Sequence, residues 1–232
     1  MPSAPKKTNK QPVRKKRLSP KERARVEALF ERFSTLSDNP KTELHFDSPF
    51  TLVVAVALSA QATAVQVNKA TDKLFAVYNT PQAIYDLGVD GLIPWINSIG
   101  LFRNKAKNVI ELSRIILEQH GGQTPLNRED LQALPGVGRK TASVVLNELD
   151  IEPAIAVDTH VYRVSHRLKL SAGKTPDAVE ADLMAIVPQP YLTRAHHWLI
   201  LHGRYVCLAR KPKCAECQVA DLCPSRELFM GG

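Results

Sequence analysis

The sequence has few cysteines, no long apolar run and no acidic residue near its beginning. Its four cysteines are too few for a disulfide-built scaffold, and its 11 glycines and 16 prolines are too few for a fibrous protein. The longest apolar run, Leu52 to Leu58, is far shorter than the roughly 20 residues that span a bilayer. No apolar segment follows the N-terminal charges, as a secretory signal would require. The 232 residues, 44% of them hydrophobic, are enough for one large or two small packed domains, and we expect them inside the cell.

The positive charge of the chain is concentrated at its N-terminus. Its formal net charge is +8, yet residues 1–21 hold eight Lys and Arg and no acid, while the rest carries 23 residues of each sign. We predict that residues 1–19 form a disordered basic tail, because they contain too little apolar surface to offset the entropy lost on folding. Such a tail either improves solubility or tethers the protein to nucleic acid in a salt-sensitive way. The stretch Pro12–Arg17 also fits a nuclear import signal.

Helix signals dominate the rest of the chain. A Ser or Thr precedes a Pro at four places, which is typical of an N-cap followed by the first helical residue: Ser19, Ser48, Thr80 and Thr175. Three further candidate caps are Asp90, Asn127 and Asp158. The run Leu52–Leu58 could be a strand by composition, but its flanking caps favour a buried helix. No Asn-Gly hairpin signal joins alternating strands, so we predict an all-α chain of about ten helices.

A glycine-rich turn lies between two helical stretches, residues 128–133 and 139–149. Two glycines one residue apart permit a tight reversal and let another backbone come close. The amides of such a turn and of the next helix N-terminus form a site suited to phosphate. A Gly-x-Gly alone is most often a plain turn, but the apolar frame, the proline and the small Ala142 favour a helix-hairpin-helix that holds DNA without reading its sequence. The stretch is Leu134-Pro135-Gly136-Val137-Gly138-Arg139-Lys140-Thr141-Ala142.

Lys140 and Asp158 are the candidate catalytic pair. Lys140 lies in the first turn of the second helix, and it is either a nucleophile that attacks a sugar carbon or a lysine that contacts phosphate. Asp158 is a candidate N-cap whose other oxygen can face a cleft. The helix from Lys140 to Leu149 rises only ~14 Å, and the return over residues 150–157 can span up to ~26 Å, so the chain can bring Asp158 beside Lys140. A carboxylate there would stabilise cationic character on a sugar and help remove the proton of the amine.

Four cysteines near the C-terminus follow the spacing C-x6-C-x2-C-x5-C: Cys207, Cys214, Cys217 and Cys223. Four thiolates this close in sequence can hold one zinc ion or an iron–sulfur cubane, and a disulfide is the less favoured alternative inside a cell. Zinc sites more often pair two C-x2-C arms, and this chain has one. The loop over residues 208–213 is basic, so fixing both of its ends would present Lys211 on a rigid rim. Three nearby histidines on an apolar helix are interpreted as structural rather than as ligands: His196, His197 and His202.

Together these motifs resemble the endonuclease III family, the bifunctional DNA glycosylases and AP lyases of the helix-hairpin-helix superfamily. The resemblance runs from Lys21 to Leu228 and rests on four blocks in a fixed order: Leu58–Thr63, the hairpin with Lys140, Val157–His160, and the cysteine spacing with Leu199–Tyr205. Each block alone is suggestive, whereas the four in this order and spacing are specific.

The resemblance implies two all-α domains that flank a DNA-binding cleft. One is a six-helix domain at residues 42–152 that contains the helix-hairpin-helix, and the other combines residues 20–41 and 153–232 and carries one [4Fe-4S] cluster on the four cysteines. Lys140 matches a lysine that forms a Schiff base at C1′ of a flipped-out nucleotide, and Asp158 matches the catalytic aspartate. Gln61 and Leu101 match residues that fill the gap left by the extruded base. The residues expected to contact DNA are Gln61, Leu101, Gly136, Val137, Gly138, Arg139, Thr141, His160 and Lys211.

The implied function is base-excision repair of double-stranded DNA. The family removes oxidised pyrimidines and then nicks the abasic site 3′ to the lesion by β-elimination. We expect a monomer in the bacterial cytoplasm, associated with the nucleoid, although the basic tail leaves nuclear import open. The chain departs from the family at Ala64, where Asp is usual after the block that ends at Thr63. This departure leaves the fine substrate preference open and does not touch the catalytic pair.

Two other functions compete with this one. The mismatch-specific adenine glycosylase branch of the superfamily shares the aspartate, hairpin and cluster, but it lacks the lysine nucleophile and usually has a further C-terminal domain. A non-enzymatic DNA clamp would need neither Lys140 nor Asp158. Because the body of the chain is neutral in sum, binding must depend on how charge is arranged, with basic residues near the hairpin and the cluster facing DNA. Acidic residues such as Asp177 and Glu180 should then face elsewhere.

Overall fold

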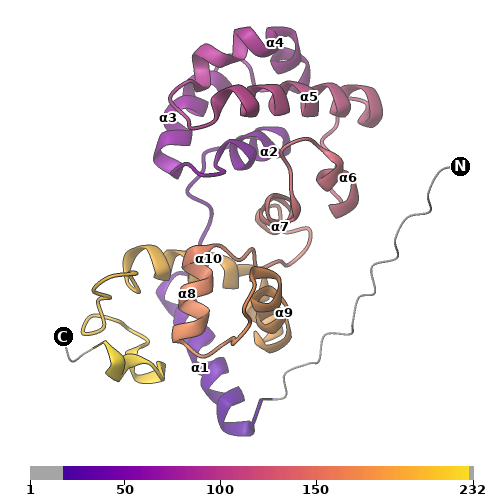
Figure 1. The fold of residues 1–232 in the computed structure, drawn as a ribbon. Coiled ribbons are helices and arrows are strands. Elements are labelled where there is room, and N and C mark those ends of the chain that lie inside the picture. Colours follow the sequence, from indigo (N-terminus) through magenta and orange to yellow (C-terminus); the bar gives the residue numbers. More distant parts are fainter. Residues whose placement is uncertain (1–17, 230–232) are drawn as a thin grey trace, which may run out of the picture.

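Ten α-helices and three short 3-10 helices make up the secondary structure of residues 18–229, the part of the chain that the computed structural model describes (Figure 1). These residues contain no strand, which confirms the all-α prediction. None of the described helices is long and apolar enough to cross a membrane. The α-helices are α1 (Pro20–Leu36), α2 (Pro49–Leu58), α3 (Ala64–Phe75), α4 (Pro81–Ile96), α5 (Phe102–His120), α6 (Arg128–Ala133), α7 (Arg139–Glu148), α8 (Thr159–Arg167), α9 (Pro176–Ile186) and α10 (Leu192–Tyr205). The 3-10 helices are η1 (Gln189–Tyr191), η2 (Ala220–Leu222) and η3 (Arg226–Leu228).

Side-chain caps explain where many of the helices begin. Six of the predicted caps accept a backbone N–H in the first turn of their helix, and these predictions are confirmed: Ser19, Ser48, Thr80, Asn127, Asp158 and Thr175. The prediction for Asp90 is wrong, because Asp90 lies inside α4. The break in that helix comes at Gly88, whose φ of 63° interrupts the helix without a side-chain cap. Residues 1–17 of the predicted tail lie outside the described residues.

The helices from α2 to α7 share one hydrophobic core. Every residue of α2 from Phe50 to Leu58 is buried, which is why this helix is apolar on all sides and why the run Leu52–Leu58 is a helix rather than a strand. Helices α5 and α7 pack against α2, and they contribute residues such as Leu112 and Leu146 to the same cluster. This core therefore places α7, which carries Lys140, against the most buried helix of the chain.

A second hydrophobic core joins the two ends of the described chain. It combines Phe30 and other apolar residues of α1 with residues from Ile155 to Val219. Polar contacts fix α1 in place: the Arg25 guanidinium donates to the carbonyl of Leu222 (3.2 Å), and the Trp198 indole donates to the carbonyl of Ser37 (2.9 Å). We propose that these two cores are the two predicted domains, residues 42–152 for the first and residues 20–41 with 153–232 for the second.

The two cores meet at a junction of buried and half-buried polar groups. The Glu148 carboxylate, at the end of α7, lies 2.8 Å from Nε2 of His197 on α10, and each side chain is only 3% exposed. The same carboxylate accepts the backbone N–H of Thr42 (3.3 Å) in the segment between α1 and α2. Glu43, next in that segment, pairs with Arg204 and accepts from the hydroxyl of Tyr205, both on α10. These contacts hold α7 in a defined position relative to α8 and α10.

Candidate active site and cysteine cluster

The turn between α6 and α7 has the backbone of a tight hairpin. Gly136 has a φ of +80°, and an added Cβ would lie 3.2 Å from the Asn108 side chain on α5, so both conformation and space require glycine there. Val137 is 3% exposed and belongs to the first core, and its N–H donates to the carbonyl of Leu134. Gly138 differs, because its φ is −81° and an added Cβ would have no atom within 4 Å. Nothing in the fold requires glycine at Gly138, and the space beside it is open.

Helix α7 begins without a side-chain cap. Gly138 is its N-cap residue and offers no side-chain acceptor, so the backbone N–H groups of the first turn remain available to an anion. Lys140 lies in this turn with an exposed side chain, and Thr141 is half-buried. The hairpin therefore presents a lysine amine beside unpaired amides, as the sequence predicts for a phosphate-binding turn.

Arg139 is already engaged by acidic residues of α9. Its guanidinium lies 2.9 Å from the Glu180 carboxylate and 3.8 Å from that of Asp177. The expectation that these two acids face away from the hairpin is therefore wrong. The sequence could not reveal this contact, because it depends on how α9 of the second core packs beside α7. DNA would have to compete with Glu180 for Arg139.

Asp158 caps α8 with one oxygen and leaves the other without a hydrogen bond. Its Oδ1 accepts the N–H groups of His160 (2.9 Å) and Val161 (2.8 Å). No group among residues 18–229 bonds Oδ2, so this oxygen can face a substrate, as predicted. Asp158 and Lys140 form no direct hydrogen bond or ion pair with each other. The cap fixes the carboxylate at the start of α8.

Close packing of α10 on α8 fixes the helix that begins at Asp158. A Cβ added to Gly203 would lie 2.8 Å from the Cβ of His160, so only glycine permits the approach. Arg163 donates to the carbonyls of Gly203 (2.8 Å) and Cys207 (3.0 Å), and it lies 3.2 Å from Nδ1 of His160. His160, which was expected to contact DNA, is half-buried in this packing.

His196 on α10 is close enough to Lys140 to sense its charge, and it also interacts with the segment that leads to Asp158. Its ring is 4% exposed and interacts with the backbone of Ala156, two residues before Asp158. Burial, the adjacent His197 and the charge of Lys140 lower the pKa of His196 to about 3. The ring is therefore neutral at physiological pH, and it places no second positive charge near the lysine amine. His196 and His197 are buried structural residues, as predicted.

Three of the predicted DNA-contacting residues have left-handed backbone conformations. The φ angles are 57° for Gln61, 59° for Leu101 and 49° for Lys211. Side chains other than glycine rarely adopt this conformation, which costs about 1–2 kcal/mol per residue. All three side chains are exposed, and Leu101 exposes 59% of its surface. Strained, exposed residues of this kind are typical of functional sites.

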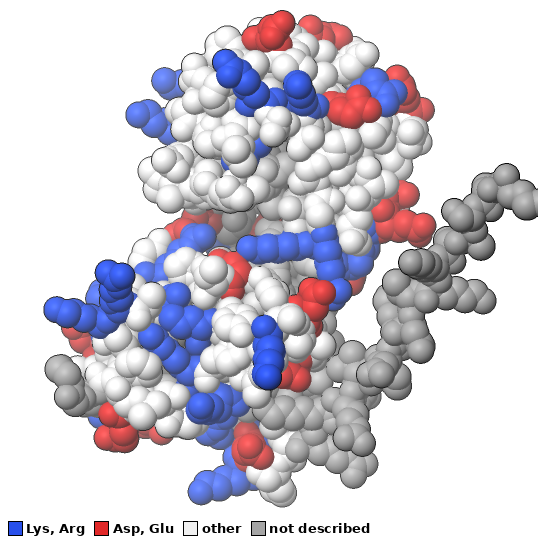
Figure 2. Space-filling model, in the orientation of Figure 1, with Lys and Arg blue, Asp and Glu red and all other residues white. Residues whose placement is uncertain are grey.

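Basic side chains gather on the face of the molecule that Figure 2 shows. Figure 2 shows Lys and Arg concentrated at the narrowed middle, between the upper and lower helices of Figure 1, and over the lower half. Helix α7 lies at this narrowed level in Figure 1. A body that is neutral in sum thus has basic side chains at the level of α7, the helix that carries Lys140.

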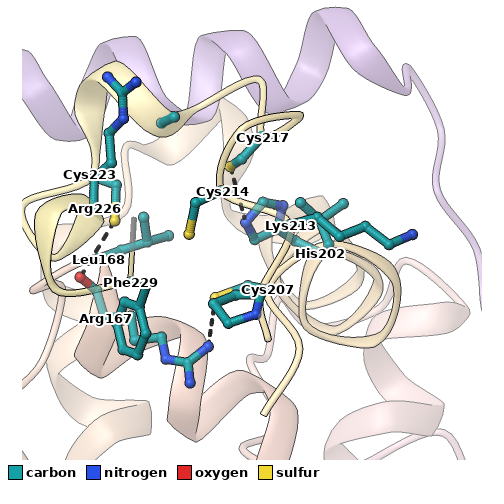
Figure 3. A pocket seen from close by; sticks show the side chains of 13 residues that line it. Arg167, Leu168, His202, Cys207, Lys213, Cys214, Cys217, Cys223, Arg226 and Phe229 are labelled. Atoms are coloured by element: carbon teal, nitrogen blue, oxygen red, sulfur yellow. Dashed lines mark hydrogen bonds between the residues drawn. The ribbon is translucent and has the colours of Figure 1, made fainter. Parts of the chain in front are cut away.

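The four cysteines line one pocket near the C-terminus. Figure 3 shows the sulfur atoms of Cys207, Cys214, Cys217 and Cys223 arranged around a common space. All four thiols are free. Burial raises the pKa of the Cys217 and Cys223 thiols, so a bound cation is needed to hold them as thiolates.

Comparisons with known proteins agree with this geometry. Residues 54–189 match the family described as the HhH-GPD superfamily of base excision DNA repair proteins, and residues 207–223 match the iron–sulfur binding domain of endonuclease III. Endonuclease III of Haemophilus influenzae is 55% identical over 88% of this chain and 96% of its own length. This chain belongs to the endonuclease III family. As a member it is a base-excision repair enzyme, a DNA glycosylase and AP lyase.

Further endonuclease III relatives support the assignment. The Escherichia coli K12 protein is 55% identical over 82% of this chain and 90% of its own length. A trapped covalent intermediate of an endonuclease III with DNA has a TM-score of 0.83 and 39% identity, over 92% of this chain and all of the other. A non-covalent endonuclease III–DNA complex has a TM-score of 0.84 over 92% of this chain. The fold and the hairpin described above are thus those of the endonuclease III family.

The cysteine pocket fits the iron–sulfur cluster of the endonuclease III family. The four thiols surround one space, and residues 207–223, which contain them, match the iron–sulfur binding domain of endonuclease III. This match supports an iron–sulfur cluster in the cysteine pocket rather than one zinc ion.

The structure adds two site residues that the sequence motifs did not identify. Arg167 on α8 donates to the Cys207 sulfur (3.4 Å) and to the carbonyls of Leu208 (2.6 Å) and Ala209 (3.0 Å), while its guanidinium covers the Phe229 ring (Figure 3). Lys105 on α5 reaches the loop that contains Gln61. Neither residue is close in sequence to the group that it contacts, so no local pattern could have identified it.

Proposed function

We propose that this enzyme removes oxidised pyrimidines from double-stranded DNA by means of Lys140 and Asp158. The neutral amine of Lys140 attacks C1′ of the damaged nucleotide, and the bond from C1′ to the base breaks. The base leaves with its electron pair and takes up a proton. The bond from C1′ to the ring oxygen O4′ then breaks, O4′ takes up a proton that the amine loses, and a protonated imine forms between Lys140 and the opened sugar. A proton then leaves C2′, the bond from C3′ to its phosphate oxygen breaks by β-elimination, and water releases the sugar from Lys140. The strand is thereby nicked 3′ to the lesion.

The observation that supports this proposal is the placement of Lys140 in the first turn of an uncapped helix, directly after the open Gly138. The amides of that turn suit a DNA phosphate, which would bring a sugar carbon within reach of the amine. Oδ2 of Asp158, which has no hydrogen-bond partner in the described part of the chain, suits a role in stabilising positive charge on the sugar and in accepting the amine proton. The neutral His196 adds no competing charge to this site.

We propose that Gln61 and Leu101 enter the DNA and fill the space left by the extruded base. Both are exposed, and both are held in a left-handed conformation at a turn. Gly136 and Val137 shape the hairpin, and the remaining contacts come from Gly138, Arg139, Thr141, His160 and Lys211. We further propose that damaged duplex DNA is bound by a monomer in the bacterial cytoplasm, since the relatives named above are bacterial.

Borohydride trapping on a duplex with one abasic site tests the lysine assignment. Borohydride reduces an imine to a stable amine, so the wild-type protein should become covalently attached to DNA. Lys140→Gln should give no trapped product, whereas Lys73→Gln, which changes an exposed lysine of α3, should trap like the wild type. Equal trapping by Lys140→Gln and the wild type would refute the assignment. Base excision by the wild type without trapping would instead favour a monofunctional glycosylase, and DNA binding without either reaction would favour a clamp.

A further inference from the structure

The two exposed turns that carry Gln61 and Leu101 come from different parts of the first core. Gln61 lies between α2 and α3, where the N–H of Ala62 donates to the carbonyl of Ser59 (3.0 Å) and Thr63 caps the following helix. Leu101 lies between α4 and α5 and is the N-cap residue of α5, with no side-chain cap. The Leu101 side chain cannot form a hydrogen bond, so a polar link between the two turns must come from another residue.

Lys105 bonds to both turns. Its backbone N–H donates to the carbonyl of Leu101 (3.1 Å), in the first turn of α5. Its side-chain ammonium donates to the carbonyl of Ala60 (2.7 Å), the residue immediately before Gln61. One residue thus connects the two turns by two hydrogen bonds, and one of these is strengthened by the charge of the ammonium.

The position of Lys105 is unfavourable for a lysine whose role is only structural. The residue is 7% exposed, and burial lowers the pKa of its ammonium. It forms no ion pair among residues 18–229, and it lies near the N-terminus of α5, where the helix dipole disfavours positive charge. A buried cation without a charged partner costs stability. A nonpolar side chain would fill the same place without this cost, so the amine is better explained by what it holds.

We propose that Lys105 is a positioning residue that holds the Gln61 and Leu101 turns as one rigid unit, so that both side chains enter the DNA together when a base leaves the stack. This proposal rests on the proposed function, in which Gln61 and Leu101 occupy the space of the extruded base. Without the bond from Lys105 to Ala60 the two turns are less tightly linked. The entropy lost on ordering them then adds to the free-energy cost of base extrusion.

The proposal predicts a difference between two substrates. A damaged base must be unstacked and extruded before Lys140 can react, and this step uses Gln61 and Leu101. An abasic site has no base to extrude, so its reaction with Lys140 depends far less on the two turns. Loss of the Lys105 amine should therefore slow base excision while leaving imine formation at an abasic site almost unchanged.

Lys105→Met tests this, because methionine keeps an unbranched apolar stem and removes the amine. Lys107→Met is the matched control, since Lys107 is an exposed lysine two residues along the same helix, and its loss measures the effect of one positive charge. Single-turnover excision of thymine glycol and single-turnover trapping at a preformed abasic site are measured for both variants. A 2-aminopurine next to the lesion reports unstacking by fluorescence. Iron content and thermal unfolding confirm that the variants are folded.

We expect excision by Lys105→Met to be about ten- to a hundredfold slower than by the wild type, as for loss of one charged hydrogen bond. The fluorescence rise should slow to the same extent, and trapping at the abasic site should stay within about threefold of the Lys107→Met rate. Equal losses on both substrates, or no loss on either, would overturn the role of Lys105. Failure of the wild type to excise or trap would instead refute the proposed function, so the two failures are distinguishable.

Discussion

The two glycines of the hairpin should respond in opposite ways to the same substitution. Alanine at Gly136 must adopt a φ of +80° and place its Cβ 3.2 Å from the Asn108 side chain. The left-handed conformation costs about 1–2 kcal/mol, and the reduced entropy of the unfolded chain returns about 0.4–1 kcal/mol. We expect a net loss of about 1 kcal/mol, which lowers the Tm by about 2–4 °C for a chain of this size.

Gly138 has an ordinary φ of −81°, and an added Cβ meets no atom within 4 Å. Gly138→Ala should therefore leave the Tm nearly unchanged, because the reduced entropy of the unfolded chain is offset by the lower preference for alanine than for glycine at the N-cap of α7. Its methyl group, however, occupies the open space beside the uncapped α7, where we expect the DNA backbone to approach. We expect binding of a duplex with an unreactive abasic analogue to weaken about tenfold, which is about 1.4 kcal/mol.

Thermal unfolding and fluorescence anisotropy at one fixed salt concentration separate the two effects. Gly136→Ala should lose stability, whereas Gly138→Ala should lose DNA affinity without losing stability. If Gly138→Ala unfolded at as low a temperature as Gly136→Ala, the geometric reasoning would be wrong. If it were stable and bound DNA as tightly as the wild type, the hairpin would not be where the DNA backbone docks.

Two further predictions concern buried charge and the hairpin ion pair. Folding lowers the pKa of His196 from about 6.5 to about 3, so the stability that its neutral form provides is present above pH 6.5 and is lost as the pH falls toward 3. Between pH 7 and pH 5 this residue should lower the free energy of unfolding by about 2 kcal/mol. In thermal unfolding His196→Asn should remove that part of the pH dependence, and an unchanged pH dependence would contradict the assignment. The double substitution of Asp177→Asn and Glu180→Gln frees Arg139 from both of its carboxylate partners, so non-specific duplex affinity should rise and its slope against log salt should steepen by up to about one. An anisotropy titration that showed the same slope as the wild type would exclude Arg139 from DNA binding.

Local features of the fold could be predicted from the sequence, because they depend on neighbouring residues. The caps at Ser48 and Thr175 were predictable, since a side chain reaches only the amides two or three residues away. The helix over Leu52–Leu58 was predictable because the caps that flank it favour a helix, although its composition would also allow a strand. The prediction for Asp90 failed because Gly88, two residues earlier, adopts a left-handed conformation that ends the helical segment first.

Contacts between distant helices were beyond such reasoning. The free Oδ2 of Asp158 followed from its cap position, but the bonds of Lys105 and Arg167 depend on residues 40 or more positions away in the chain. The expectation that Glu180 faces away from the hairpin was wrong, since the sum of charges does not say which helices meet. The candidate reactive residues could be proposed from the sequence, but the groups that hold them in place could not.

The second core also constrains how the chain folds during synthesis. Helix α1 leaves the ribosome first, yet its partners are Leu168, Trp198 and Leu222, and the last of these is 197 residues away from Arg25. The helices from α2 to α7 can complete their own core in the meantime, whereas α1 must wait for Leu168 and Trp198, and Arg25 for Leu222 as well. A nascent chain that ends before Leu168 therefore has all the helices of the first core, including α7 with Lys140, but none of these partners of α1. The second core, which includes residues on both sides of Asp158, is completed later.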